Sequence, residues 1–408
     1  MGIQLFMGQA LFLATVVVSG LVLRRLLRLE LGLACLCCGV VAGLLLPWLG
    51  LDTGIRASNI HDLVFYVILP VLIFEAAWHL KPSLLRRWLS PILVLSTFGM
   101  LVSCAVAGTL LYYVMAEPEG FPWIAAFLAA AILAATDPVA VVSSLRKLNA
   151  PDELTTLVEG ESLFNDASAL VIFGVILSLA MNTESSLDAG FLSVFAVTFI
   201  GGLLVGALLG LIAAVIALLI KQRSASNILL VLLAFSSFFV AEHFFHVSGI
   251  MSVVTAAIVS RVLLREHEEH LLCDVLSTWN WLGLFFNALI FVLMGLVITF
   301  DMFTQQWLAI AIAIPAALIA RLIAVFASDL IGGRFVRPIP LGWRYILVWG
   351  GLRGAIAIVL VLSLPLNLPY WWTIQSMVFG VVLFSLLIQG TSVHHLINRY
   401  ASDHNPKF

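Results

Sequence analysis

The stretch EGESLFNDASALVIF, from Glu159 to Phe173, runs from acidic and polar residues directly into a long apolar segment. Asp166 lies about half-way along a helix that the surrounding sequence places inside a bilayer. An ionisable group at that depth costs on the order of 2.5–3.5 kcal/mol on insertion scales, so its default interpretation is functional. Helical geometry puts Ser162 one turn from Asp166 on the same face, and the neighbouring face carries Glu161, Asn165 and Ser168. Two polar stripes that meet at mid-membrane depth predict a site for a small cation.

The composition is that of a membrane protein. The chain has 408 residues, of which 62% are hydrophobic and 10% are charged, whereas a soluble domain carries about 25% charged residues. The five cysteines fall in apolar segments or in a loop that we place in the cytoplasm, so no disulfide framework is expected. We expect a chain that crosses the lipid bilayer many times, with no cofactor and no nucleic-acid partner.

Apolar runs of about 17–28 residues predict transmembrane helices. We expect thirteen spans, near residues 8–23, 31–49, 60–79, 90–115, 122–145, 156–180, 191–220, 226–245, 248–264, 281–299, 307–327, 343–365 and 372–393. Of the 20 Lys and Arg residues, two (Arg321 and Arg353) lie inside spans, and all but one of the others (Arg56) fall in loops on one side. The positive-inside rule then puts the N-terminus outside and a short tail, residues 398–408, in the cytoplasm.

Two of these spans contain helix-breaking residues. In the fifth, Pro138 follows Thr136 and Asp137, and it lacks an amide hydrogen and disfavours helix just before itself. In the twelfth, three glycines loosen the helix in the same way, namely Gly350, Gly351 and Gly354. The two spans run in opposite directions. This arrangement suggests inverted-topology repeats, which place the substrate where the unwound backbones cross.

Few ionisable residues lie inside the spans. Asp137, Asp166 and Arg353 fall near the middle of the bilayer, and Glu75 lies somewhat towards the cytoplasm. Carboxylates, a serine hydroxyl and freed backbone carbonyls form an environment of hard oxygen atoms, which suits Na⁺ better than metals that prefer thiolates.

Three motifs carry a resemblance to a known family. They are Thr136-Asp137-Pro138, EGESLFND at Glu159–Asp166 and GGLRGAIA at Gly350–Ala357. Together they closely resemble the NhaP-type monovalent cation–proton antiporters of the cation:proton antiporter superfamily, relatives of the animal sodium–proton exchangers. The resemblance covers essentially the whole chain. It implies an NhaA-like antiporter fold and a homodimer, with a moving core bundle at residues 88–181 and 305–397 and a static interface bundle at 1–80 and 190–300.

The resemblance also implies roles for single residues. Asp166 would alternate between a proton and a cation, and the cation shell would be completed by Asp137, Ser162, Glu75 and the backbone carbonyl of Thr136. Glu161 would form a structural ion pair with Arg353. Asn165 would tie the sixth span to the unwound stretch instead of binding the ion.

The expected function is secondary active exchange of Na⁺ or Li⁺ for H⁺ by alternating access, in a bacterial-type inner membrane. We expect one cation per proton, because Asn165 cannot ionise and the sixth span therefore offers one titrating group at the crossing, Asp166, and not two adjacent acids. Alternatives remain open at this point: a K⁺/H⁺ antiporter, a cation channel, or an intramembrane aspartyl protease that uses Asp137 and Asp166. Single residues also have structural alternatives, with Asp137 as a helix cap, Glu75 held by an arginine or by backbone, and Arg321 snorkelling or paired with Asp329.

Overall fold

The computed structural model describes residues 3–27, 29–48, 63–115, 120–181, 191–267, 269–332 and 336–401. Within these ranges the chain is helical and contains no strand. The end of the predicted tail, beyond residue 401, lies outside the described residues, as do Arg28 and Arg56 of the charge pattern.

The first half of the chain forms helices that include two single π-helical segments, η1 and η2. The elements are α1 (Ile3–Leu27), α2 (Leu31–Trp48), η1 (Val64–Ile68), α4 (Leu69–His79), α5 (Pro82–Val94), η2 (Leu95–Gly99), α6 (Met100–Val114), α7 (Trp123–Ala134), α8 (Val139–Lys147) and α9 (Asp152–Ala180). Since α5, η2 and α6 follow one another without a gap, they form one continuous apolar helix from Pro82 to Val114.

The second half continues in the same way. Its elements are α10 (Phe191–Ile220), α11 (Arg223–Phe239), η4 (Val240–Phe244), α12 (Gly249–His267), α13 (Glu269–Val297), α14 (Phe300–Gln305), α15 (Trp307–Gly332), α16 (Leu341–Trp349), α17 (Ala355–Leu362), α18 (Trp371–Phe384), η5 (Ser385–Gln389) and α19 (Gly390–Tyr400).

The helices are those of a multi-pass membrane protein. Among the described residues, 8 helices are long and apolar enough to cross a membrane, and four further apolar helices are shorter. Where the structure describes them, the segments expected from the sequence are helical apart from the two breaks.

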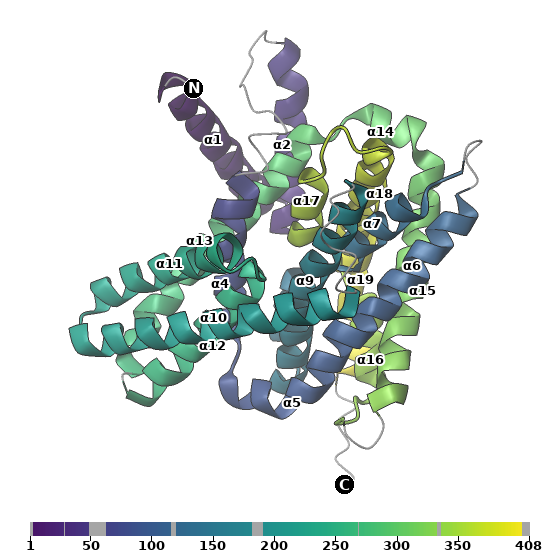
Figure 1. Ribbon diagram of the computed structural model, residues 1–408. Coiled ribbons are helices and arrows are strands. Elements are labelled where there is room, and N and C mark those ends of the chain that lie inside the picture. Colours follow the sequence, from purple (N-terminus) through teal and green to yellow (C-terminus); the bar gives the residue numbers. More distant parts are fainter. Residues whose placement is uncertain are drawn as a thin grey trace.

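Small residues let neighbouring helices approach closely, as is usual for helix packing in membranes. A Cβ atom at Gly206 of α10 would collide with the Ser252 backbone of α12, and one at Gly39 of α2 would collide with the Val292 carbonyl of α13. In Figure 1, α10, α11 and α12 lie together on the left, α6 and α15 lie side by side on the right, and α9 runs between these groups.

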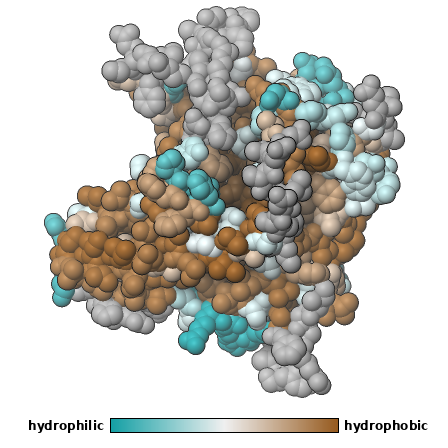
Figure 2. Space-filling model, in the orientation of Figure 1, coloured by the Kyte–Doolittle hydropathy of each residue, from teal (hydrophilic) through white to brown (hydrophobic). Residues whose placement is uncertain are grey.

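The surface follows the same division. Figure 2 shows a hydrophobic surface over the region of α10–α12 and a hydrophilic patch at the lower edge, where α5 lies. Exposed apolar side chains on α10 include Leu204, Leu208 and Leu219. An apolar surface of this extent is typical of a protein that faces lipid or another membrane helix.

The two breaks expected from the sequence are present. Helix α7 ends at Ala134 and α8 begins at Val139, while α16 ends at Trp349 and α17 begins at Ala355. The unwound stretches between them, 135–138 and 350–354, lie against α9 and define the candidate site.

Candidate functional site

The two unwound stretches are joined through Asp137. Its backbone amide donates to the Leu352 carbonyl at 2.8 Å. Its Oδ1 accepts from the Val139 amide at 3.0 Å, and its Oδ2 accepts from the Ala355 amide at 3.2 Å. These amides begin α8 and α17, and helix N-termini favour negative charge. One carboxylate therefore caps two half-helices, which is the structural alternative considered above for Asp137.

Gly354 makes this double cap possible. A Cβ atom at Gly354 would collide with the Asp137 carboxylate. Only a residue without a side chain allows α17 to begin so close to Asp137. Gly351 has a related role, because a Cβ atom there would lie 2.8 Å from Nε of Arg321.

Helix α9 holds the first unwound stretch through two side chains. The Ser162 hydroxyl donates to the Thr136 carbonyl. Nδ2 of Asn165 donates to the Ala134 carbonyl at 2.9 Å and to Oγ1 of Thr136 at 3.1 Å. The last carbonyls of a helix have no partner inside it, so Asn165 satisfies a group that the end of α7 leaves free and ties α9 to the break.

The predicted ion pair between Glu161 and Arg353 is wrong. Arg353 instead donates through Nη1 to the carbonyls of Ala134 and Ala135, at 2.9 and 3.0 Å. It is nearly fully buried, and it lies at the C-terminal end of α7, where carbonyl oxygens attract a positive charge. The carbonyls at the end of α7 therefore bind the guanidinium group that the resemblance had assigned to Glu161.

Glu161 pairs with Arg321 of α15. Nη1 and Nη2 of Arg321 donate to Oε1 and Oε2 of Glu161 at 2.7 and 2.9 Å, a bidentate pair between buried groups. Nε of Arg321 also donates to the Leu347 carbonyl of α16 at 3.2 Å. The expectation that Arg321 snorkels or pairs with Asp329 is therefore wrong as well, since Asp329 pairs with Arg344 at 2.8 Å.

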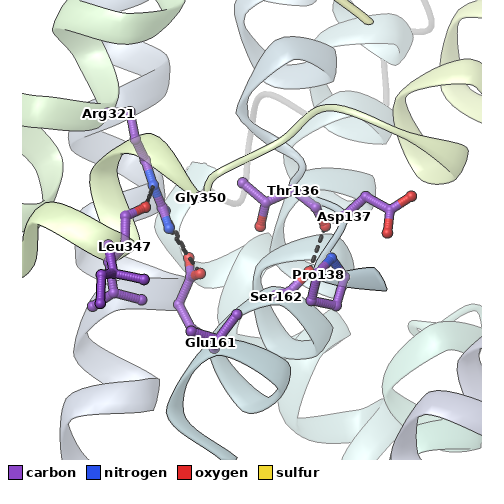
Figure 3. A pocket seen from close by; sticks show the side chains of 10 residues that line it. Thr136, Asp137, Pro138, Glu161, Ser162, Arg321, Leu347 and Gly350 are labelled. Carbon is purple, nitrogen blue, oxygen red and sulfur yellow. Dashed lines mark hydrogen bonds and ion pairs between the residues drawn. The ribbon is translucent and has the colours of Figure 1, made fainter. Parts of the chain in front are cut away.

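A small cavity lies between these groups. It is lined by Thr136, Asp137, Pro138, Glu161, Ser162, Arg321 and Gly350, among others. Figure 3 shows the Arg321–Glu161 pair on one side of the cavity, and Thr136, Asp137 and Ser162 on the other. The cavity thus brings together sequence-predicted residues of the two unwound stretches and of α9.

Asp166 lies one turn along α9 from Ser162. It is 8% exposed, and its Oδ1 has no hydrogen-bond partner among the described residues. The carboxyl group accepts a backbone hydrogen bond from Thr136 and lies within electrostatic range of Asp137, Glu161 and Arg353. A buried carboxyl oxygen without a partner is rare in folded proteins. It is suited to accept a proton or to coordinate a cation.

Glu75 is not brought to the cavity. It lies on α4, where its carboxylate is 3.2 Å from Nδ1 of His79 and packs against Gly283 of α13. His79 in turn bonds Asn280 of α13 at 2.8 Å. The partner of Glu75 is thus a histidine, which the sequence reasoning did not consider.

The charges at the crossing leave one negative charge uncompensated. Asp137, Glu161 and Asp166 are opposed by Arg321 and Arg353. If all five groups are ionised, three negative charges face two positive ones. One proton or one monovalent cation then makes the crossing neutral, whereas a divalent cation would leave it positive.

This geometry can be compared with known proteins. The chain matches the family described as "Sodium/hydrogen exchanger, transmembrane" over residues 12–399. The chain belongs to this family. The resemblance that the three motifs carry is thereby confirmed.

Some relatives are close to this chain in length, and others are longer. The Na⁺/H⁺ antiporter NhaP of Pseudomonas aeruginosa is 34% identical over 85% of this chain and 82% of its own. NhaH of Halobacillus dabanensis is 31% identical over 96% of this chain and 97% of its own. The chain covers 66% of the length of NhaS2 from Synechocystis, to which it is 31% identical. All three are named Na⁺/H⁺ antiporters, which are transporters and not enzymes.

A solved structure shares the fold. The sodium proton antiporter MjNhaP1 of Methanocaldococcus jannaschii superposes with a TM-score of 0.83 at 20% identity, covering 98% of this chain and 100% of that one. The arrangement of broken helices described above therefore belongs to a fold already seen in an antiporter.

Proposed function

We propose that this protein is a secondary active transporter that exchanges Na⁺ for H⁺, one for one, by alternating access. The observation that carries the proposal is the buried, unpartnered Oδ1 of Asp166 at a crossing where three acids face two arginines. Sodium is the chosen cation because the relatives above are named for it; Li⁺ has the same charge and also prefers hard oxygen ligands.

Each side chain then has a defined part. Asp166 holds either the proton or the cation, while Ser162 and the Thr136 carbonyl supply neutral oxygens from the cavity wall. Asp137 lies opposite two helix N-termini, and its two amide hydrogen bonds favour the negative charge that would face the cation. Glu161 and Asn165 hold α9 to its neighbours and do not bind the ion. In this conformation Glu75 lies next to His79 and is not one of the proposed ligands of the cation.

The same proposal includes the arrangement in the membrane. Thirteen spans in a bacterial inner membrane would put the N-terminus outside and the C-terminus in the cytoplasm, as the basic residues indicate. Residues 88–181 and 305–397 would form the moving core bundle, and 1–80 and 190–300 the interface bundle of a homodimer. Opposed breaks in α7–α8 and α16–α17 support inverted repeats, and the apolar face of α10 supports an interface or lipid contact there.

Reconstitution into sealed liposomes tests the proposal. Wild-type protein should dequench a pH dye when Na⁺ is added and should drive Na⁺ uphill at the expense of a proton gradient, which a channel cannot do. Asp166→Asn should abolish both signals in a folded protein. The matched control is Asp301→Asn, because Asp301 is exposed on α14, away from the crossing. Substantial exchange by the Asp166→Asn variant would refute the assignment.

A further inference from the structure

Glu30 lies at a boundary between the two proposed bundles. It directly precedes α2, and its backbone carbonyl accepts the first bond of that helix, from the Ala34 amide at 3.0 Å. Its side chain reaches away from α2 to the start of α19. A Cβ atom added at Gly390 would lie 3.3 Å from Oε2 of Glu30. Helix α2 belongs to the interface bundle and α19 to the core bundle, so this carboxyl group spans the junction.

The second feature of Glu30 is that its carboxylate has no direct partner among the described residues. Among the described residues, no hydrogen bond or ion pair joins its carboxylate to another group. The charged groups within electrostatic range are Asp137 of the first break, Lys147 at the end of α8 and Arg24 of α1. Helix α19 contributes no charge next to Gly390; its nearest titratable residue in sequence is His394, one turn further on.

We propose that Glu30 is a pH-responsive contact between α2 and α19, and that its ionisation releases the core bundle for transport. This inference rests on the proposed function, because it needs a core that moves against the interface bundle. When Glu30 is neutral, the carboxyl group packs against Gly390 without an electrostatic cost. When it is ionised, the contact holds a charge away from water and within range of Asp137, and separation of α19 from α2 relieves both costs.

The pH range follows from the surroundings of the carboxyl group. Burial, and then the charge of Asp137, raise the pKa of Glu30 from 4.5 to about 7. A carboxyl group with a raised pKa stabilises the contact at low pH, and this stabilisation is lost as the pH rises from 4.5 to about 7. The contact is therefore firm in acid and weakened above neutral pH. Transport should accelerate as the cytoplasmic pH rises towards about 7 and should level off above it.

The experiment measures maximal exchange rate against pH in proteoliposomes at saturating Na⁺. Saturation removes the competition between proton and cation at Asp166, so the remaining pH dependence reports steps outside the binding site. The wild type should accelerate between about pH 4.5 and 7, the range over which the contact is weakened. Glu30→Gln keeps the shape but cannot ionise, so its rate should lose this rise and stay near the wild-type acidic value. Asp301→Asn, which removes an exposed carboxylate elsewhere, should keep the wild-type profile.

A second variant approaches the contact from α19. Gly390→Ala adds a methyl group beside the Glu30 carboxylate. Because the methyl group excludes water from the carboxylate, the pH-dependent rise in exchange rate should shift to higher pH. A third measurement does not depend on transport: at pH 8, residues 385–400 should exchange amide hydrogens more slowly in Glu30→Gln than in the wild type.

Three results would overturn the proposal. One is a wild-type pH profile in Glu30→Gln, another is an unshifted profile in Gly390→Ala, and the third is a change in apparent Na⁺ affinity alone. Failure here is distinguishable from failure of the proposed function, since Asp166→Asn would still abolish exchange if only the role of Glu30 were wrong.

Discussion

Glu161 is held by the two terminal nitrogens of Arg321, whereas Arg353 contacts only backbone carbonyls at the end of α7. Removing one member of a buried ion pair leaves an unpaired charge, at a cost of about 3–5 kcal/mol. We therefore expect Glu161→Ala and Arg321→Ala each to lower the thermal unfolding temperature, and the double variant to recover part of the loss. The measurement is a double-mutant cycle of thermal stability in detergent.

The matched cycle uses Glu161→Ala with Arg353→Ala. Because these two residues lie within electrostatic range but share no ion pair, their coupling should be clearly weaker than that of Glu161 with Arg321. Strong coupling in this second cycle, and none in the first, would contradict the pairing seen here.

Ser162 and Asn165 both contact the first unwound stretch, but in different ways. Ser162→Ala removes one neutral oxygen from the cavity, worth about 1 kcal/mol, so apparent Na⁺ affinity should fall about fivefold with turnover retained. Asn165→Ala leaves the Ala134 carbonyl without one of its donors and should lower the unfolding temperature. Initial rates against Na⁺ concentration, together with thermal melts, separate the two effects. If Asn165→Ala changed affinity alone in a stable protein, their roles would be exchanged.

At the scale of the element, the second break depends on the missing side chain of Gly354. Gly354→Ala would force the new methyl group against the Asp137 carboxylate, and overpacking of this kind costs about 1–3 kcal/mol. We expect a lower unfolding temperature and a loss of exchange. Gly174→Ala in α9 is the control, since a Cβ atom there meets nothing within 4 Å; it should leave both unchanged. If Gly354→Ala and Gly174→Ala had the same unfolding temperature and exchange rate, the close approach of Gly354 to Asp137 would have no consequence for stability or transport.

The sequence predicted the helices and their breaks because these depend on local properties. The length of an apolar run predicts a helix. Pro138 and the glycines after Trp349 disfavour helix within a few residues of themselves, and the two breaks lie at these residues. The partner of Glu161 could not be obtained in this way. Arg321 and Arg353 both lie at membrane depth. Which of them pairs with Glu161 depends on how α15 packs beside α9, and on the need of the end of α7 for a positive charge. Glu75 was placed near the ion because the resemblance implied it and its depth allowed it, whereas its direction is set by His79 and Gly283 across α4 and α13.

At the scale of the whole molecule, the expected stoichiometry determines how the protein responds to voltage. If Asp166 carries either one proton or one Na⁺, both half-cycles move the same charge, and a membrane potential worth about 2.3 kcal/mol per charge per 100 mV has no effect on the equilibrium. Na⁺ accumulation should then be equal in proteoliposomes clamped with K⁺ and valinomycin at 0 and about −100 mV. The control first establishes that K⁺ is not transported. A clear difference between the two voltages would identify a second proton carrier.

The double cap by Asp137 also limits how the protein can diversify. Any replacement of this residue disturbs the start of α8 and of α17 at once, so its contribution to the ion cannot be adjusted without altering the backbone that surrounds the ion. Ser162 is under no such restriction, since its hydroxyl meets the Thr136 carbonyl through a single hydrogen bond. Variation in cation preference on this scaffold should therefore accumulate at Ser162 and at the residues that orient Thr136, with Asp137 left invariant.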